Sequence, residues 1–169
     1  GSVQGSALAI AKALGGAGAR VALHGLATRE EAAAACAEVT AAGACDVRFF
    51  AGDMRDVSAI EGLMRDVRAW GEVDILVNNA GIQHTAPLAD MPRDTWEAIL
   101  AINLSAAFHT MQALMPVMAA RGFGRVINIA SVHGLVASKD KAPYVAAKFG
   151  LVGLSRVAAL EYAGGGSRD

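Results

Sequence analysis

Segments of strand character alternate with segments of helical character along the chain, and this alternation limits the possible folds more than any other feature. Helical spacing of small and apolar residues predicts helices over about 5–14, 29–42, 56–70, 93–120 and 142–163, and short β-like runs predict strands over 20–24, 47–50, 73–77 and 125–129. Alternating β and α elements favour a parallel sheet covered on both faces. We therefore expect an α/β fold, a doubly wound parallel sheet of the Rossmann-like kind with three layers (αβα).

Residues at the ends of these segments support the same boundaries. Thr28 is placed to cap the helix over 29–42, because its side-chain oxygen can accept hydrogen bonds from the free amides of the first turn. Gly43 follows that helix, and glycine is common where a helix ends. The pair Gly15 and Gly16 stops the first helix in the same way.

The composition is that of a folded chain with one core. The 169 residues are 54% hydrophobic and 18% charged, and the formal net charge is −1. This length is sufficient for one domain, which we expect over residues 1–163 with a flexible tail at 164–169. The balanced charge argues against a nucleic-acid partner, because such proteins carry a basic excess.

Other patterns bear on location and metals. No uninterrupted apolar run reaches the roughly 18 residues of a membrane span, and the start has no secretory pattern. Cys36 and Cys45 lack the spacing of a metal site or a CxxC motif. We expect a cytoplasmic protein with two reduced thiols, no metal and no membrane contact.

Polar residues follow two of the predicted strands. Asn78 and Gln83 come just after the strand over 73–77, and Ser131 and His133 come just after the next one. The carboxyl ends of parallel strands meet at one edge of a sheet, where ligands bind in folds of this class. We expect these four side chains to gather at that edge.

Tyr144 and Lys148 stand four residues apart in a predicted helix, thirteen residues after Ser131. Positions i and i+4 share one face of a helix, so a phenol and an ammonium would lie side by side. A cation a few ångströms from a phenol favours the phenolate, which makes the pair a candidate proton donor and acceptor for interconverting an alcohol and a ketone. The alternative is a helix with one buried ring and one solvated lysine.

Glycines open the chain ahead of the first helix. Gly1 and Gly5, with Ala7 at the third position, are spaced like a loop that lets the backbone approach a pyrophosphate at a helix N-terminus. Such a loop normally follows a strand, and none precedes it in this sequence. The alternative interpretation is a set of glycines without a ligand.

Together these residues resemble the short-chain dehydrogenase/reductase family. The resemblance rests on Gly1-x-x-x-Gly5, Asp53, Asn78-Asn79-Ala80-Gly81, Asn103, Ser131 and Tyr144-x-x-x-Lys148, which occur in the family's order over almost the whole chain. It implies a nicotinamide cofactor and hydride transfer to or from a carbonyl carbon.

The resemblance implies a catalytic role for four residues. Tyr144 would be the acid/base, and Lys148 would favour its ionised form and bind the nicotinamide ribose. Ser131 would donate a hydrogen bond to the substrate oxygen, although it can also be just a residue that ends a strand. Asn103 would bind a water in a proton relay, the alternative being a tolerated polar residue that faces solvent.

The resemblance also implies a set of cofactor-binding residues. Asp53, with Met54 beside it, would accept a hydrogen bond from the adenine amino group, although a carboxylate there can also form a turn or a helix cap. Asn79 would tie strands together. The full expected cofactor set is Gly1, Gly5, Leu26, Asp53, Met54, Asn78, Ala80, Gly81, Tyr144 and Lys148.

A narrower resemblance concerns the substrate. The runs 78–84, 127–134 and 141–144 are similar to the group of this family that interconverts D-3-hydroxybutyrate and acetoacetate in ketone body metabolism. In that group a Gln, a His and a Lys at the places of Gln83, His133 and Lys141 bind the substrate carboxylate, next to Ser131 and Tyr144. A small hydroxy acid needs such a cation and donors to orient it. The alternatives are solvated loop residues, as expected for His84, and a 3-oxoacyl or sugar-alcohol reductase that uses NADPH.

The choice between NAD and NADP depends on the end of the second strand of the family fold. NAD preference often uses a carboxylate there, and this sequence has His24, Gly25 and Leu26 instead. The bulk of Leu26 would obstruct a 2′-phosphate, and the narrower group uses NAD. We expect NAD, while Arg29 leaves NADP open.

The resemblance further implies parts for which this sequence has no residues. Family members begin with a strand that lies between the strands at 20–24 and 73–77, and they continue past the last helix. We therefore expect an incomplete dinucleotide-binding domain, a fragment or a sequence without its ends. The helices over 93–120 and 142–163 correspond to the family's oligomer surface, which implies a homotetramer. A catalytically silent oligomerising subunit is the alternative, and the intact set of Asn103, Ser131, Tyr144 and Lys148 argues against it.

Overall fold

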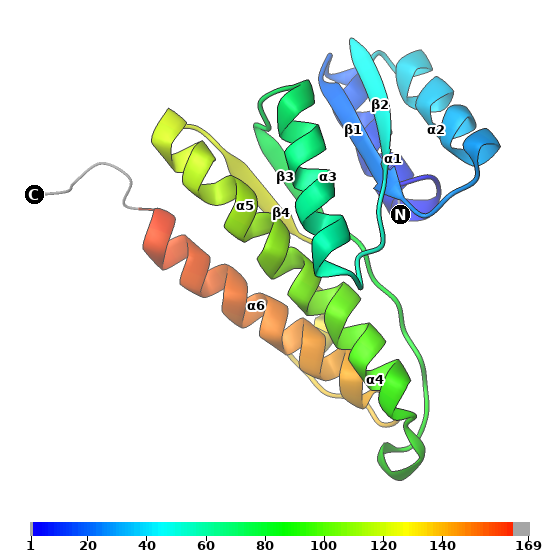
Figure 1. Cartoon of the computed structure of the whole chain (residues 1–169). Helices are drawn as coiled ribbons and strands as arrows, with labels where there is room; N and C mark the ends of the chain where they lie inside the picture. The colour runs from blue at the N-terminus through cyan, green and yellow to red at the C-terminus, as the bar shows by residue number, and fades with distance from the viewer. Residues whose placement is uncertain (1, 164–169) are drawn as a thin grey trace, which may run out of the picture. The chain divides into compact units, whose positions relative to one another are not determined.

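A computed structural model of the protein describes residues 2–163, so Gly1 and the expected tail at 164–169 lie outside the described residues (Figure 1). In chain order the elements are α1 (Gly5–Gly16), β1 (Arg20–Gly25), α2 (Arg29–Ala41), β2 (Asp46–Ala51), α3 (Val57–Trp70), β3 (Ile75–Asn78), η1 (Leu88–Asp90), α4 (Arg93–Leu100), η2 (Ala101–Ser105), α5 (Ala106–Arg121), β4 (Arg125–Asn128), η3 (Val132–Gly134) and α6 (Ala142–Tyr162). Every predicted strand and helix is present, with boundaries that differ by at most two residues.

The long helix predicted over 93–120 is interrupted. A π-helical turn at Ala101–Ser105 separates α4 from α5, and Asn103 inside it is buried. A π-turn widens the helix by one residue, a feature frequent at functional sites.

All paired strands are parallel, which confirms the predicted α/β class. They form two two-stranded sheets, β1 with β2 and β3 with β4. Among residues 2–163 no strand pairs with the second edge of β1 or of β3. Ser2 caps part of the free edge of β1, because its amide donates to the His24 carbonyl at 2.6 Å and its Oγ accepts from the His24 amide at 3.0 Å.

The described residues form two compact units, each with its own packing. The first comprises the residues up to Asp53 together with Arg65–Gly71, and the second comprises Met54–Met64 and the residues from Glu72 onward. In the first unit α1 and α2 pack on one face of the β1–β2 sheet. The buried side chains of that core are Ala11, Val21, Leu23, Ala35, Val39 and Ala44.

Helix α2 begins and ends as its sequence predicts. The Thr28 hydroxyl accepts from the Glu31 amide at 3.2 Å, and the Glu31 carboxylate accepts from the Thr28 amide at 2.8 Å. This reciprocal capping box satisfies two amides that the first turn cannot pair internally. Gly43 follows the helix with φ +120°, a left-handed backbone that glycine adopts readily.

In the second unit helices α5 and α6 lie against one face of the β3–β4 sheet, and Figure 1 shows α6 running alongside α4 and α5. A chain of hydrogen bonds joins these layers. Asn78 of β3 donates to Asn128 of β4 at 2.8 Å and accepts from Thr110 of α5 at 2.7 Å, and Asn128 donates to Ser155 of α6 at 2.8 Å. Because these amide and hydroxyl groups pair with one another, the polar side chains stabilise the layers instead of disrupting the core.

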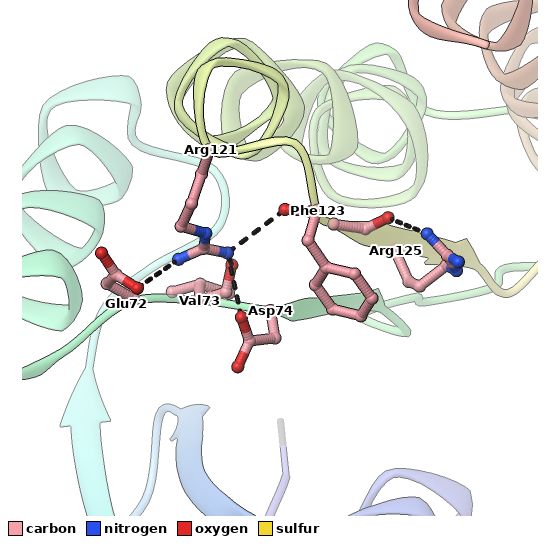
Figure 2. A network of polar contacts seen from close by, with 7 residues as sticks. Glu72, Val73, Asp74, Arg121, Phe123 and Arg125 are labelled. Carbon is pink, nitrogen blue, oxygen red and sulfur yellow. Dashed lines mark hydrogen bonds and ion pairs between the residues drawn. The ribbon is translucent and has the colours of Figure 1, made fainter. Parts of the chain in front are cut away.

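Arg121 joins the end of α5 to the segment that enters β3. Figure 2 shows its guanidinium between Glu72 and Asp74, with N–O distances of 3.1 and 3.0 Å, while the carbonyl oxygens of Val73 and Phe123 accept from it at 2.9 and 3.3 Å. A planar guanidinium can serve several acceptors in fixed directions, which an ammonium cannot do.

One helical segment of the described chain, Arg93–Arg121, is long and apolar enough to cross a membrane by length and composition. The sequence contains no uninterrupted apolar run of that length, and within this segment His109 interrupts the apolar residues. In this structure the segment packs inside the second unit, where Ile99, Met111 and Leu114 are buried.

Candidate active site

Tyr144 and Lys148 share one face of α6, as their spacing predicts. The Lys148 Nζ atom lies 5.6 Å from the centre of the Tyr144 ring. Lys148 is only 4% exposed, and its ammonium donates to the Ile129 carbonyl at 2.7 Å. Burial lowers the pKa of Lys148, because removing an ammonium from water disfavours its charged form. The alternative of a solvated lysine is therefore wrong.

Ser131 and His133 lie beside this pair. The Ser131 Oγ accepts from the His133 amide at 3.2 Å and lies 3.3 Å from the ring atom Nδ1 of His133. The His133 and Tyr144 rings meet edge to face, with centres 5.7 Å apart and planes at 74°. The other ring nitrogen of His133, Nε2, lies 2.8 Å from the Ser138 hydroxyl. The structure thus brings Ser131, His133, Tyr144 and Lys148 together within one unit.

A close approach of two backbones places the Ser131–His133 turn against α6. A Cβ atom on Gly134 would lie 2.8 Å from the Val152 side chain and 3.0 Å from the Lys148 carbonyl oxygen. The backbone at this point can lie so near the helix only because the residue has no side chain. Gly134 therefore sets the position of the serine and histidine relative to Lys148.

Asn103 faces the interior, so the alternative of a solvent-facing residue is wrong. It is 2% exposed, and its amide donates to the Ile82 carbonyl and accepts from the Ile82 amide, both at 2.8 Å. Its side chain thereby fixes the segment between Gly81 and Gln83. Each amide atom of Asn103 has one partner here, and a contact with a relay water stays a prediction.

The three residues expected at a substrate carboxylate come from segments that meet. The Ala86 amide donates to the Asp140 carbonyl at 2.9 Å, which joins the segment after Gln83 to the residue before Lys141. Gln83 is exposed and Lys141 is half-buried. His133 has both ring nitrogens next to serine hydroxyls, so binding a carboxylate would require it to give up one of these contacts. The carboxylate site stays a prediction.

The first unit carries several of the expected cofactor residues. Gly5 starts α1 with φ +62°, which favours glycine, and a Cβ atom there would meet nothing within 4 Å. The N-cap residue Gln4 makes no side-chain hydrogen bond to the first turn. Leu26 is 66% exposed just after β1. This arrangement fits the phosphate end of a dinucleotide.

His24 anchors the loop in front of Asp53. Its Nε2 lies 3.0 Å from the Gly52 carbonyl oxygen, and burial, as the largest cause, lowers the pKa of His24. Asp53 directly follows Gly52, so the hydrogen bond orients the segment from which an adenine contact is expected. No local sequence pattern predicts this role of His24, because the pairing crosses from β1 to the residue after β2.

The second unit carries the remaining cofactor candidates, Met54, Asn78, Ala80 and Gly81. Ala80 and Gly81 follow β3 directly, and a Cβ atom on Gly81 would contact the Asn103 amide at 3.7 Å. The side chain of Asn78 ties β3 to β4 and α5, the kind of role that the sequence analysis gave to its neighbour Asn79. A cofactor contact by Asn78 stays a prediction.

Comparison with known proteins connects this geometry to a family. The sequence matches the family described as short chain dehydrogenase over residues 1–166. A D-beta-hydroxybutyrate dehydrogenase of Cupriavidus necator is 48% identical over 165 residues, which cover 96% of this chain and 63% of that protein. A D-beta-hydroxybutyrate dehydrogenase of Rhizobium meliloti is 44% identical over 98% of this chain and 65% of its own length. The chain thus spans just under two thirds of the length of these two relatives.

Two further matches carry other names. A 3-oxoacyl-(acyl-carrier-protein) reductase of Escherichia coli is 38% identical over 98% of this chain and 66% of its own length. The crystal structure of a metagenomic short-chain oxidoreductase in complex with NADP is 37% identical, with a TM-score of 0.92 over 98% of this chain and 75% of that one. The similarity therefore extends to relatives with different substrates in their names.

Proposed function

Because this chain belongs to the short chain dehydrogenase family, we propose that its protein is an NAD(P)-dependent oxidoreductase that interconverts a secondary alcohol and a ketone. The observation that carries the proposal is the Tyr144–Lys148 pair, with a buried ammonium 5.6 Å from the ring centre and Ser131 and His133 beside it. A phenol next to a desolvated cation is suited to exchange a proton with an alcohol.

Tyr144, Ser131 and Lys148 each have a defined role in the proposed reaction. A bound nicotinamide nucleotide supplies the hydride acceptor or donor. The Tyr144 phenolate would take the proton of the alcohol during oxidation, and the resulting hydroxyl would return it to the carbonyl oxygen during reduction. The Ser131 hydroxyl donates a hydrogen bond to the same substrate oxygen, which stabilises the negative charge that develops there. Lys148, anchored on the Ile129 carbonyl, places its ammonium 5.6 Å from the centre of the phenol ring.

The residues present fit a dinucleotide. The N-terminus of α1 with Gly5 suits the pyrophosphate, and the Gly52–Asp53 segment suits the adenine. We propose NAD as the physiological form. The bulk of the exposed Leu26, which would obstruct a 2′-phosphate, supports that choice. Arg29 and the NADP in the metagenomic relative are reasons to include NADP in the tests.

We propose D-3-hydroxybutyrate and acetoacetate as the substrate pair. Two relatives with that activity in their names, at 48% and 44% identity, support this choice over a 3-oxoacyl or sugar-alcohol substrate. Gln83, His133 and Lys141 would bind the carboxylate. Among residues 2–163 no ion pair engages Lys141, so its ammonium is available to an anion.

We further propose that the protein is a cytoplasmic homotetramer. Apolar side chains on the two long helices are exposed on the isolated chain, including Phe108 at 43%, Phe149 at 45% and Val157 at 51%. Burying such side chains between copies would remove apolar surface from water.

The decisive experiment is an assay of the purified full-length protein. D-3-hydroxybutyrate with NAD and with NADP should be compared with a panel of neutral secondary alcohols. Tyr144→Phe should lower kcat by about 10²–10⁴-fold while the Kd for the cofactor changes little. Retained turnover in Tyr144→Phe would exclude the phenol as the acid/base.

The substrate assignment has its own variant and control. Lys141→Ala should raise KM for hydroxybutyrate by about tenfold or more and leave KM for a neutral alcohol unchanged, because only the former has a carboxylate to lose a partner. Lys139→Ala, which removes an exposed ammonium from the same loop, is the matched control. If Lys141→Ala changed KM for hydroxybutyrate and KM for a neutral alcohol equally, Lys141 would not bind the substrate carboxylate.

A further inference from the structure

Asp140 has a backbone conformation that residues other than glycine rarely adopt. Among residues 2–163 it is the only non-glycine residue with a positive φ, which is +63°. This left-handed region is unfavourable for an L-residue because of its Cβ atom, although asparagine and aspartate enter it more readily than most side chains. Such a conformation persists where the surrounding structure holds it, and it is concentrated at functional sites. A contact that depends on this conformation would explain why Asp140 has it.

The carbonyl oxygen of Asp140 makes such a contact, because it accepts from the Ala86 amide at 2.9 Å. The next residue, Lys141, is the N-cap of α6, and its own carbonyl accepts from the Val145 amide at 2.9 Å. Asp140 is thus the last residue before the chain enters the helix. A switch to one of the ordinary backbone regions, all of which have a negative φ, would change the path of the chain at this point and with it the contact to Ala86.

Gln83 lies in a segment that is held at both ends. Before it, the amide and the carbonyl of Ile82 are both hydrogen-bonded to the buried side chain of Asn103 at 2.8 Å. After it, Ala86 donates to Asp140. The first contact attaches the segment to the π-helical turn, and the second attaches it to the start of α6.

We propose that Asp140 is a positioning residue that holds Gln83 and Lys141 in place to bind one substrate carboxylate together. Its left-handed backbone keeps its carbonyl oxygen on the Ala86 amide, and this hydrogen bond fixes the two segments relative to each other before the substrate arrives. A site whose donors are fixed in advance loses less free energy to ordering them when the substrate binds. The inference rests on the proposed function in that Gln83 and Lys141 are taken to bind the carboxylate.

Substitutions of Asp140 separate the effect of the backbone from that of the side chain. Asp140→Asn removes the charge but still enters the left-handed region readily, and Asp140→Gly enters it without steric penalty. Asp140→Val introduces a β-branched side chain, for which this region is strongly unfavourable. Asp140→Ala has a smaller penalty of the same kind.

Steady-state kinetics of the full-length protein provide the first test. Asp140→Val should raise KM for D-3-hydroxybutyrate by about three- to tenfold, with kcat and with KM for a neutral secondary alcohol unchanged. Asp140→Ala should give a smaller rise in the same direction, and Asp140→Asn and Asp140→Gly should stay within about twofold of wild type. A rise with Asp140→Asn as large as with Asp140→Val would show that the carboxylate matters instead of the backbone. That result, or an equal loss with both substrates in the valine and alanine variants, would overturn the proposal.

Hydrogen–deuterium exchange measures the contact itself without any turnover. In the full-length protein, the peptide that contains Ala86 should exchange faster in Asp140→Val than in wild type, and at the wild-type rate in Asp140→Asn and Asp140→Gly. Unchanged exchange in Asp140→Val would overturn the proposal. Faster exchange with an unchanged KM for hydroxybutyrate would also overturn it.

Failure of this inference can be distinguished from failure of the proposed function. If the wild-type protein prefers hydroxybutyrate to neutral alcohols and Asp140→Val keeps that preference, only the role of Asp140 is wrong. If the wild-type protein has no such preference and Lys141→Ala affects both substrates equally, the carboxylate site is absent and the inference fails with it.

Discussion

The Nζ atom of Lys148 lies 2.7 Å from the main-chain oxygen of Ile129, in a residue that is 4% exposed. The ammonium is therefore held between the end of β4 and the first turns of α6, next to the Tyr144 ring. Burial lowers the pKa of Lys148, and the effect of this lowered pKa on the stability of the protein can be measured.

Lys148 should make stability depend on pH in the alkaline range. Burial lowers its pKa from the ordinary value of 10.5, so between the lowered pKa and 10.5 the unfolded chain binds more protons than the folded one. The free energy of unfolding of wild type minus that of Lys148→Met should rise with pH in this window and be constant below it. Urea denaturation at a series of pH values measures the difference, and a constant difference throughout would contradict the buried ammonium.

His24 should make stability depend on pH in the acid range. Burial lowers its pKa from 6.5, so the contribution of the neutral ring is fully present above about 6.5 and is lost as the pH falls through the lowered pKa. His24→Gln can keep the donor to the Gly52 carbonyl without titrating. Wild type should therefore lose stability relative to His24→Gln on acidification below about 6.5. Thermal or urea denaturation of both proteins tests this, and parallel pH profiles would speak against it.

Gly134→Ala should destabilise the protein and impair the site. The added Cβ would lie 3.0 Å from the Lys148 carbonyl oxygen, a backbone atom that cannot move without disturbing α6. We expect a loss of about 1–3 kcal/mol together with a lower kcat, because Ser131 and His133 would be displaced.

Gly153→Ala, on the helix α6 against which Gly134 packs, is the matched control. Its Cβ would meet nothing within 4 Å, and replacing a helical glycine by alanine stabilises by about 0.5–1 kcal/mol. If both variants had the same stability, the close approach at Gly134 would not be a constraint.

Arg121→Ala should destabilise the second unit. It removes a guanidinium shared by Glu72, Asp74 and two carbonyl oxygens (Figure 2). We expect a loss of about 1–3 kcal/mol in urea denaturation, since the hydrogen bonds involve a charged donor. Arg121→Lys should recover only part of it, because an ammonium cannot reach all four acceptors.

An exposed ion pair provides the comparison. Lys12 and Glu38 are 3.1 Å apart with side chains 44% and 51% exposed, so Lys12→Ala should change stability by no more than about 0.5 kcal/mol. A loss as large as that of Arg121→Ala would indicate that exposure does not distinguish the two sites.

Much of the fold could be predicted from local patterns. Thr28 and Glu31 form the capping box that begins α2, and Tyr144 and Lys148 share the face that a four-residue separation dictates. These relationships span a single helical turn, so helix geometry alone decides them. The family resemblance was confirmed by the match over residues 1–166.

The partners of the site residues could not be predicted in the same way. Asn103 pairs with Ile82, twenty-one residues earlier, and His24 pairs with Gly52, twenty-eight residues later. No local signal indicates such a pairing, because it depends on how loops cross after the helices have packed.

Strand and helix order, helix ends and the phenol–ammonium pair were determined by the sequence itself, because periodicity and capping act within a few residues. The tertiary structure decided that Lys148 is buried on Ile129, that Asn78 joins the layers of its unit, and that His133 lies between two serines. These features depend on desolvation and on hydrogen bonds between distant segments, and both arise only when the chain is packed.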